Sequence, residues 1–168
     1  MEMTDLLPIE EWMVLEKEIH DRFDLDANVF NTEGIRVTTY KSWVNRLCPE
    51  IKATDKGQSF ICAVAHMNLA IMASKSGQAI AEECDAGIIK VVVPVFVADE
   101  FVGAVGACGK CLDDGEVESF LVNKITDIDE ETVETLSEGI GSISSAKIQE
   151  LIDFVEERIK SILSTIES

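Results

Sequence analysis

The spacing of apolar residues predicts several helices along the chain. After Pro8, which suits the first turn of a helix, apolar side chains recur at helical spacing, at Ile9, Trp12, Met13, Ile19 and Phe23. A short helix is expected from Ser42 to Cys48, because Pro49 disfavours helical backbone in the residue before it. A long, largely apolar helix is expected from Gly57 to Gly77, where a glycine suits the C-terminal cap.

Other segments have the composition of strands. Ile88–Val97 and Phe101–Cys108 are rich in β-branched and aromatic residues, and the three residues between them predict the turn of an antiparallel hairpin. Its almost continuous apolar character indicates that both faces are covered, one by helices and the other by a pocket or a partner. Residues 27–40 predict two short strands around a turn at Gly34, and residues 78–83 predict another strand. The pattern as a whole predicts an α/β (α+β) fold with an antiparallel sheet, flanking helices and a long C-terminal helix.

The C-terminal segment carries a heptad pattern. Apolar residues recur at spacings of 4, 3, 4, 3 and 4, at Ile148, Ile152, Val155, Ile159, Ile162 and Ile166. Such a seam packs either on its own domain or on the same helix of a second copy. We expect the second arrangement, a homodimer in which residues 142–168 form an amphipathic dimerisation helix attached to a domain of residues 1–141.

Charge narrows the range of partners. Acidic residues outnumber basic ones 32 to 14, which gives a net charge of -18 and disfavours nucleic acid and anionic membranes as partners. No apolar run approaches the roughly 18 residues that cross a bilayer. The first residues lack the features of a signal peptide, so a cytoplasmic location and reduced cysteines are expected.

The five cysteines suggest three kinds of chemistry. Cys108 and Cys111 form a Cys-x-x-Cys pair, and Cys62 lies four residues before His66 on one face of the predicted long helix. A site built from Cys62, Cys84, Cys108 and Cys111 could hold zinc or an iron–sulfur cluster. The cysteines could also carry thiol chemistry, since Lys110 would lower a neighbouring thiol pKa, or simply fill the core. The residues alone do not decide between a metal site, thiol chemistry and core packing.

One stretch resembles a known family. "CDAGIIKVVVPVFVADEFVGAVG" (residues 84–106), preceded by "GQSFIC" and by "LC" at residues 47–48, is similar to the PocR family of prokaryotic sensory domains. The resemblance extends from about Trp12 to Cys111. It implies a PAS- or GAF-like fold that binds a small organic compound and passes a signal to a partner. The chain departs from the family pattern at Ala65 and at Ala107-Cys108-Gly109, which indicates a site remade around sulfur.

The resemblance leads to a functional hypothesis. We expect a stand-alone cytoplasmic sensory module, not an enzyme, that binds a small organic ligand, or a metal or cluster through its cysteines, and acts through a signalling protein partner. The pocket is expected between the long helix and the hairpin, lined by Phe60, Cys62, His66, Met67, Cys84, Val93, Phe101 and Cys108. The alternative is a GAF-like free methionine sulfoxide reductase with Cys84 as nucleophile, because "ECDAGIIKVVVPV" is similar to the segment around the catalytic cysteine of those enzymes.

Overall fold

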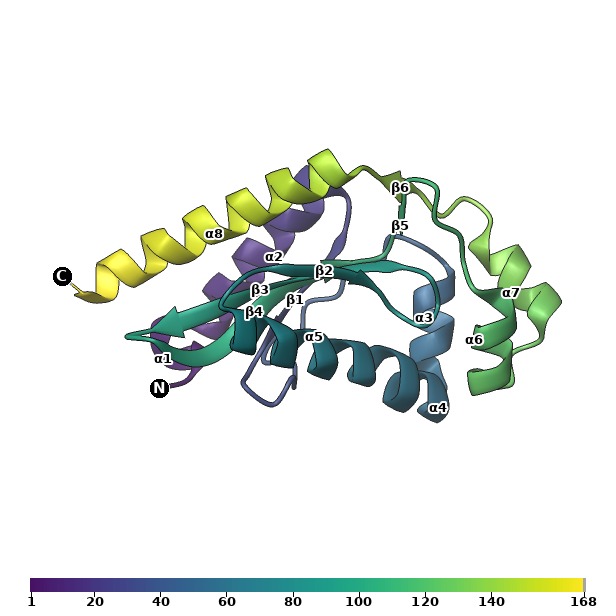
Figure 1. Cartoon of the computed structure of the whole chain (residues 1–168), viewed down its shortest axis with the longest axis horizontal. Helices are drawn as coiled ribbons and strands as arrows, with labels where there is room; N and C mark the ends of the chain where they lie inside the picture. Colours follow the sequence, from purple (N-terminus) through teal and green to yellow (C-terminus); the bar gives the residue numbers. More distant parts are fainter. Residues whose placement is uncertain (168) are drawn as a thin grey trace.

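A four-stranded antiparallel sheet organises the chain. The computed structural model describes residues 1–167 and orders the strands β1-β4-β3-β2. Their bounds are Asp26–Phe30 for β1, Ile80–Glu83 for β2, Ile89–Val97 for β3 and Glu100–Cys108 for β4. Helices α2 (Ile9–Phe23) and α8 (Ser145–Glu167) lie along one face of the sheet, and α5 (Ala63–Ser76) lies along the other (Figure 1). The predicted mixed fold, with its antiparallel sheet and long C-terminal helix, is confirmed.

The hairpin of β3 and β4 supplies the two central strands. Its turn is the pair Ala98-Asp99, with φ of 49° and 68°, the left-handed backbone of a two-residue hairpin turn. Alternate side chains of β3 point to opposite faces. Val91, Val93 and Val95 belong to the core beneath α2 and α8, whereas Val92 packs with Leu69 of α5. Both faces of the hairpin are therefore covered, as its apolar run predicts.

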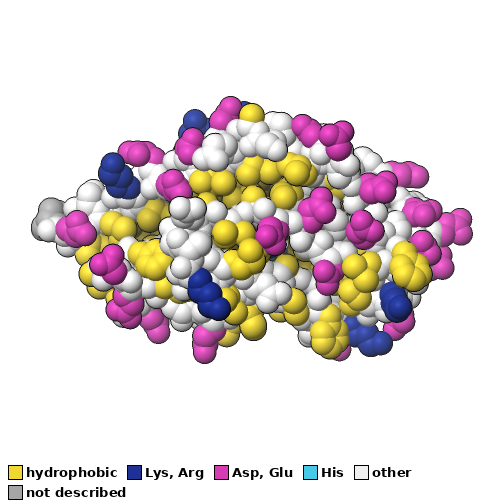
Figure 2. All heavy atoms as spheres, in the orientation of Figure 1, with side chains coloured by type: hydrophobic (Ala, Val, Ile, Leu, Met, Phe, Trp, Pro, Cys, Tyr) yellow, Lys and Arg dark blue, Asp and Glu magenta, His cyan; other side chains and the backbone are white. Residues whose placement is uncertain are grey.

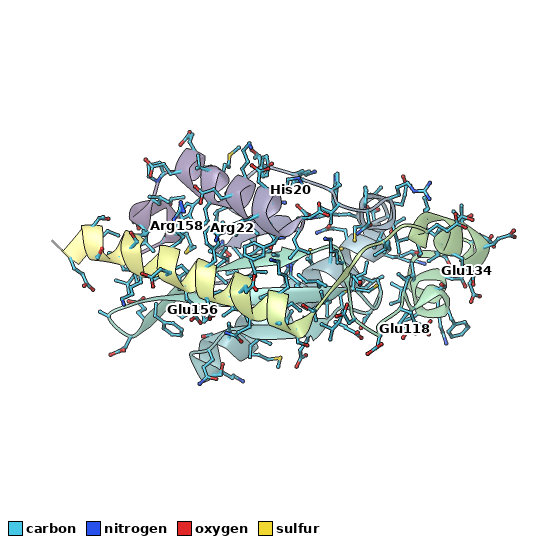
Figure 3. The ribbon with its side chains drawn as sticks, turned by 90° about the horizontal axis from the view of Figure 1, so that it is seen from above. His20, Arg22, Glu118, Glu134, Glu156 and Arg158 are labelled. Carbon is cyan, nitrogen blue, oxygen red and sulfur yellow. The ribbon has the colours of Figure 1, made fainter. Side chains whose placement is uncertain are left out.

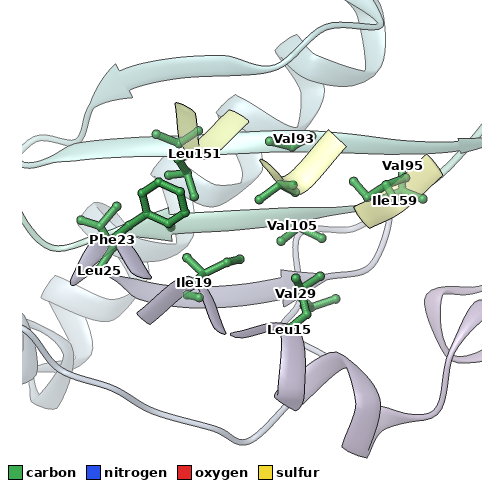
Figure 4. Packing of buried hydrophobic residues seen from close by; sticks show 14 of the residues in the cluster. Leu15, Ile19, Phe23, Leu25, Val29, Val93, Val95, Val105, Leu151 and Ile159 are labelled. Atoms are coloured by element: carbon green, nitrogen blue, oxygen red, sulfur yellow. The ribbon is translucent and has the colours of Figure 1, made fainter. Parts of the chain in front are cut away.

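The main core lies between the sheet and the pair α2 and α8. Leu15 and Ile19 of α2 contact the inner face of the strands together with Leu151 and Ile159 of α8 (Figure 4). The two helices are also joined at the surface, where Arg158 forms an ion pair with Glu18 (Figure 3). This core is made of long-range contacts between the two ends of the chain.

The seam predicted on the C-terminal helix faces this core. Ile148, Val155 and Ile159 are buried against the sheet, and Ile152 and Ile162 pack at its margin. The helix therefore covers the sheet of its own chain, and the expected division into residues 1–141 and a dimerisation helix of residues 142–168 stays a prediction. A homodimer remains a prediction from the sequence, but the inner face of α8 is not free to form it.

Shorter elements close one end of the sheet. They are α3 (Leu47–Ala53), α4 (Asp55–Gly57), the π-helical turn η1 (Gln58–Cys62), β5 (Cys111–Leu112), α6 (Ser119–Thr126), α7 (Glu130–Ser137) and β6 (Ser142–Ile143). A separate core cluster holds this end together, centred on Leu47, Ile61, Ile88 and Val122. In Figure 3, Glu118 and Glu134 mark this end of the molecule, away from Arg158. At the opposite end lies the remaining short helix, α1 (Met3–Leu6).

Two local predictions are wrong. Pro49 does not end a helix over Ser42–Cys48, because it lies in the first turn of α3, where its missing N–H has no helical partner to lose. The second strand expected within residues 27–40 is reduced to one bridge between Phe30 and Arg36. The Arg36 guanidinium instead donates to the carbonyl oxygens of Ala27 and Tyr40, which holds this segment in an irregular path.

The surface is acidic. Asp and Glu side chains are scattered over the face shown in Figure 2, with few Lys and Arg among them. Among the described residues, no helix has both the length and the apolar character needed to cross a membrane.

Candidate functional site

A small cavity lies between the α5 face of the sheet and the segments that close its end. Its volume is about 50 Å³. The lining comes from β1, β3 and β4, from the turn between β2 and β3, from the η1–α5 helix, and from α3 and the loop before it. The lining residues are Asp26, Asn28, Trp43, Val44, Asn45, Cys48, Lys52, Cys62, Ala65, His66, Cys84, Ile88, Lys90, Cys108 and Gly109. The predicted position, between the long helix and the hairpin, agrees with this cavity.

The sheet places polar side chains on the floor of the cavity. Asp26, Cys108 and Lys90 lie side by side on the adjacent strands β1, β4 and β3. On the same face, Asn28 lies opposite Gly106. A Cβ at Gly106 would approach Asn28 Oδ1 to 2.6 Å, so glycine gives this amide its room.

The helical wall is formed where η1 passes into α5. The π-helical turn ends at Cys62, and four residues later His66 faces the same cavity. The His66 ring lies against Phe30, with ring centroids 4.3 Å apart. Single π-helical turns are frequent at functional sites, because the extra residue re-aims the side chains that follow it.

The loop before α3 closes the cavity and is held by hydrogen bonds. Asn45 Nδ2 donates to the carbonyl oxygen of Gly109 at 2.7 Å, and the Cys48 N–H donates to Asn45 Oδ1 at 2.7 Å. The N–H and the hydroxyl of Ser42 both donate to Asp26 Oδ1 at 3.3 Å. The Asp26 carboxylate is therefore engaged by the loop.

The "CDAG" motif forms the tight turn between β2 and β3. The Cys84 N–H donates to the Ile88 carbonyl, and the Gly87 N–H donates to the Cys84 carbonyl, each at 2.9 Å. Gly87 has a φ of 81°, and a Cβ there would lie 2.2 Å from the Glu116 carbonyl oxygen. The geometry of this turn therefore requires the glycine of the motif, and the turn places the Cys84 thiol at the cavity.

Three buried polar atoms of this lining have no hydrogen-bond partner within the described part of the chain. They are Lys90 Nζ, Asn28 Oδ1 and His66 Nδ1; a fourth such atom, Gln58 Oε1, lies outside the lining. Lys90 is only 3% exposed, and its ammonium group lies 5.2 Å from the centre of the Phe30 ring. Buried polar groups in proteins are almost always paired, so these three atoms are the groups to which a molecule bound in the cavity would form hydrogen bonds.

Burial also sets the protonation of the site. It lowers the pKa of Lys90 and, together with the nearby Lys90, Lys52 and Arg36 charges, lowers the pKa of His66. Burial raises the pKa of Cys62 to about 11 and raises the pKa values of Cys48 and Cys84. These three thiols are therefore protonated at neutral pH. Lys110 does not activate Cys111, because it pairs with Asp24 at 3.0 Å and burial raises the Cys111 pKa.

The structure brings together half of the predicted ligand-binding residues. Cys62, His66, Cys84 and Cys108 all line the cavity. The other four, Phe60, Met67, Val93 and Phe101, do not. Phe60 and Met67 lie on the outer face of the helix, 59% and 50% exposed, and Val93 belongs to the core on the opposite face of the sheet. Phe101 packs on Phe96 near the hairpin turn.

The four-cysteine metal site is not assembled. Over residues 1–167, no group of three or more His, Cys, Asp or Glu side chains is arranged to hold a metal ion. Cys111 lies on β5 in the core of the closed end, and Cys48 takes the fourth cysteine position in the cavity lining. The expected zinc or iron–sulfur centre therefore lacks its ligand geometry here.

The sequence prediction missed Lys90 and Asn28. A signal for Lys90 was present, since it is the one charged residue in the apolar run from Ile88 to Val97. A lysine on a strand covered on both faces must be buried. Asn28 had no comparable signal, because β1 was predicted without its neighbours in the sheet.

The sequence of the chain matches one known protein family. The family described as the sensory domain found in PocR matches residues 5–167. No curated protein and no solved structure matches the chain. Because the match covers nearly the whole chain, including every element around the cavity, the chain belongs to the PocR family of sensory domains.

Proposed function

We propose that this chain is a sensory module that binds a small organic molecule in the cavity between α5 and the sheet, and that it passes the bound state to a protein partner. The observation that carries the proposal is the cavity itself, in which Lys90, Asn28 and His66 present unpaired polar atoms. Ligand sites typically combine apolar walls with a few convergent polar groups. Here the walls are thiols, aliphatic side chains and the ring of Trp43.

The groove next to the cavity supports a route of entry. Asn28, Lys52 and His66 line the cavity and also line a more open groove of about 340 Å³, which extends past Gly34 and Gln58. A molecule in this groove would reach the cavity by passing His66. The small volume of the cavity restricts the inner part of the ligand to a few non-hydrogen atoms.

Binding chemistry is favoured over catalysis. A thiol nucleophile acts as its thiolate, and catalytic cysteines have lowered pKa values. Burial shifts the Cys84 pKa in the opposite direction. Membership of a sensory family points the same way.

The sheet offers a physical path for the signal. Lys90 of β3 faces the cavity, whereas its neighbour Val91 faces the core that contains Leu151 and Val155 of α8. A ligand that moves Lys90 would move the backbone to which Val91 belongs. We propose that α8 reports this change to the partner.

The test is thermal unfolding of the purified protein with a series of small alcohols, amides and carboxylic acids. A ligand at a hundredfold excess over its Kd should raise the unfolding temperature by about 5 °C or more. Ala65→Leu adds three carbon atoms to the wall of the cavity and should abolish the shift. Val64→Leu is the matched control, because Val64 is exposed on the same helix.

A compound that stabilises the Ala65→Leu variant as much as the wild type binds elsewhere and would contradict the proposal. Absence of stabilisation across the whole series would contradict it as well.

A further inference from the structure

We propose that the ligand is a short hydroxycarboxylic acid, whose carboxylate pairs with Lys90 and whose hydroxyl group donates to Asn28. The inference rests on the proposed function and specifies the chemical class that the cavity selects.

The first argument is the charge of Lys90. Its side chain is almost completely buried, and none of the ion pairs of the described residues includes it. Two carboxylate residues flank Lys90 on the sheet. Glu82, its direct partner on β2, is exposed and forms no ion pair with it, and Asp26, on the far side of Cys108, is engaged by Ser42. The ring of Phe30 offers only a partial counterpart. Burial lowers the pKa of Lys90 because an unpaired ammonium is costly in the core. A carboxylate that enters the cavity favours the ammonium form again and supplies its missing partner.

The second argument is the local balance of charge. The chain as a whole has a net charge of -18, which repels anions. Around the cavity and its groove the balance is reversed, because Lys52, Lys90 and Arg36 line them. Arg36 is partly neutralised by Glu16, and Asp26 contributes one negative charge. A single carboxylate fits this balance better than a phosphate, which carries more charge and more acceptor oxygens.

The third argument is the Asn28 amide. Its Oδ1 atom is an acceptor without a donor among the described residues, so a ligand with an O–H or N–H group gains a hydrogen bond there. A simple carboxylate offers a partner to Lys90 but none to Asn28. A short hydroxycarboxylate carries one group for each, and His66 Nδ1 lines the same cavity as a further partner.

The experiment is calorimetric titration at pH 7.5 with lactate and with lactamide, its neutral analogue of the same shape. Lactate should bind the wild-type protein with a Kd at least tenfold lower than lactamide, because hydrogen bonds to charged groups contribute more than neutral ones. Lys90→Met is unbranched and one atom shorter, and it removes the amine, so it should weaken lactate binding at least tenfold. Lys75→Met, at the exposed end of α5, is the control and should leave the Kd unchanged.

Folding of the Lys90→Met variant is not at risk. Replacing a buried, unpaired charge by an apolar side chain of similar volume removes a desolvation cost, so this variant should unfold at the same temperature as the wild type or higher. The hydroxyl contact is tested with propionate, which lacks that group. Propionate should bind less tightly than lactate, and Asn28→Ala should abolish the difference.

The results separate this inference from the proposed function. If lactamide binds as tightly as lactate, or if Lys90→Met binds lactate as tightly as the wild type, the carboxylate is not recognised and the inference fails. If neutral compounds then bind the wild-type protein but not the Ala65→Leu variant, the proposed ligand-binding function is still supported. If neither acids nor neutral compounds bind the wild-type protein, both proposals fail.

Discussion

Glu16 is a carboxyl group completely buried on α2, and it ties the irregular segment after β1 to the core. Its carboxylate accepts a hydrogen bond from the Thr38 hydroxyl and lies 3.4 Å from Arg36. Burial outweighs these partners and raises the pKa of Glu16 from 4.5 to about 7. The folded state therefore holds a proton that the unfolded chain releases near pH 4.5.

This shift predicts the pH dependence of stability. Between about pH 4.5 and 7 the folded state binds more protons at Glu16, so the free energy of unfolding falls as pH rises through this window. The Glu16 contribution to that loss is about 3 kcal/mol. Glu16→Gln cannot titrate and should remove this part of the slope. Denaturant unfolding of both proteins at pH 5 and pH 8 provides the measurement. If the free energy of unfolding changes by the same amount between pH 5 and pH 8 in both proteins, Glu16 does not have a raised pKa.

The cavity thiols should react slowly. With a pKa of about 11, Cys62 is a thiolate in on the order of one molecule in a thousand at pH 8. Alkylation by iodoacetamide should be about a hundredfold slower in the folded protein than in the unfolded chain. Cys84 should also be slow, because burial raises its pKa too. Mass spectrometry of each alkylated peptide over time checks this, and rapid modification of Cys84 would instead favour the reductase hypothesis.

At the scale of residues, the sequence predicted contacts that depend on helix geometry. Cys62 and His66 both line the cavity, because a spacing of four fixes their common face. Phe60 and Met67 lie on the exposed face, since the same spacing does not say which face of a nearly uniformly apolar helix is covered. Lys90 and Asn28 line one cavity only through the order of the strands, which local residue patterns do not predict.

Among the elements, α8 shows that one heptad pattern of apolar residues is compatible with two kinds of packing. A heptad seam is compatible with a coiled coil or with packing on a sheet, and here Ile148, Val155 and Ile159 pack on the sheet. The exposed end differs, since Ile166 is 41% exposed. The helix therefore stabilises the domain, and its loss would uncover the core beneath it.

Two substitutions on this helix test that role. Ile159 is 7% exposed, so Ile159→Glu puts a charge into the core and should lower the free energy of unfolding by about 3 kcal/mol or more. Ile166→Glu should change it by less than about 0.5 kcal/mol, as for most surface positions. Thermal unfolding combined with light scattering distinguishes a seam that packs on its own sheet from a seam that contacts a second copy of the chain. A stable, folded monomer made from a dimeric wild type by Ile159→Glu would show that α8 is an interface.

The hairpin and the long helix were predictable because each carries its own local signals, the turn residues and Gly77 among them. Pro49 and the second strand of residues 27–40 were not. Pro49 is compatible with the start of a helix as well as its end, and only the packing of Leu47 and Ile51 in the core decides between them. The missing strand depends on Arg36, whose guanidinium pairs with Glu16 of α2 and with Ala27 of β1 as well as with Tyr40 of its own segment.

At the scale of the whole molecule, the sheet separates two faces with different tasks. The face beneath α2 and α8 is a continuous apolar core, whereas the face beneath α5 ends in a cavity with unpaired polar groups. β3 contributes to both faces, because Lys90 faces the cavity and Val91 faces the core that includes α8. The family match covers both faces.

Occupation of this cavity by a small molecule can be measured directly with amide NMR spectra of the wild-type protein, titrated with small carboxylic acids, amides and alcohols. We expect saturable shifts for the residues that line the cavity, with Asn28, His66 and Lys90 among them, and smaller shifts along β3 and α8. These shifts should be absent in the Ala65→Leu variant. Shifts confined to other surfaces, or identical shifts in that variant, would show that no small molecule binds in the cavity.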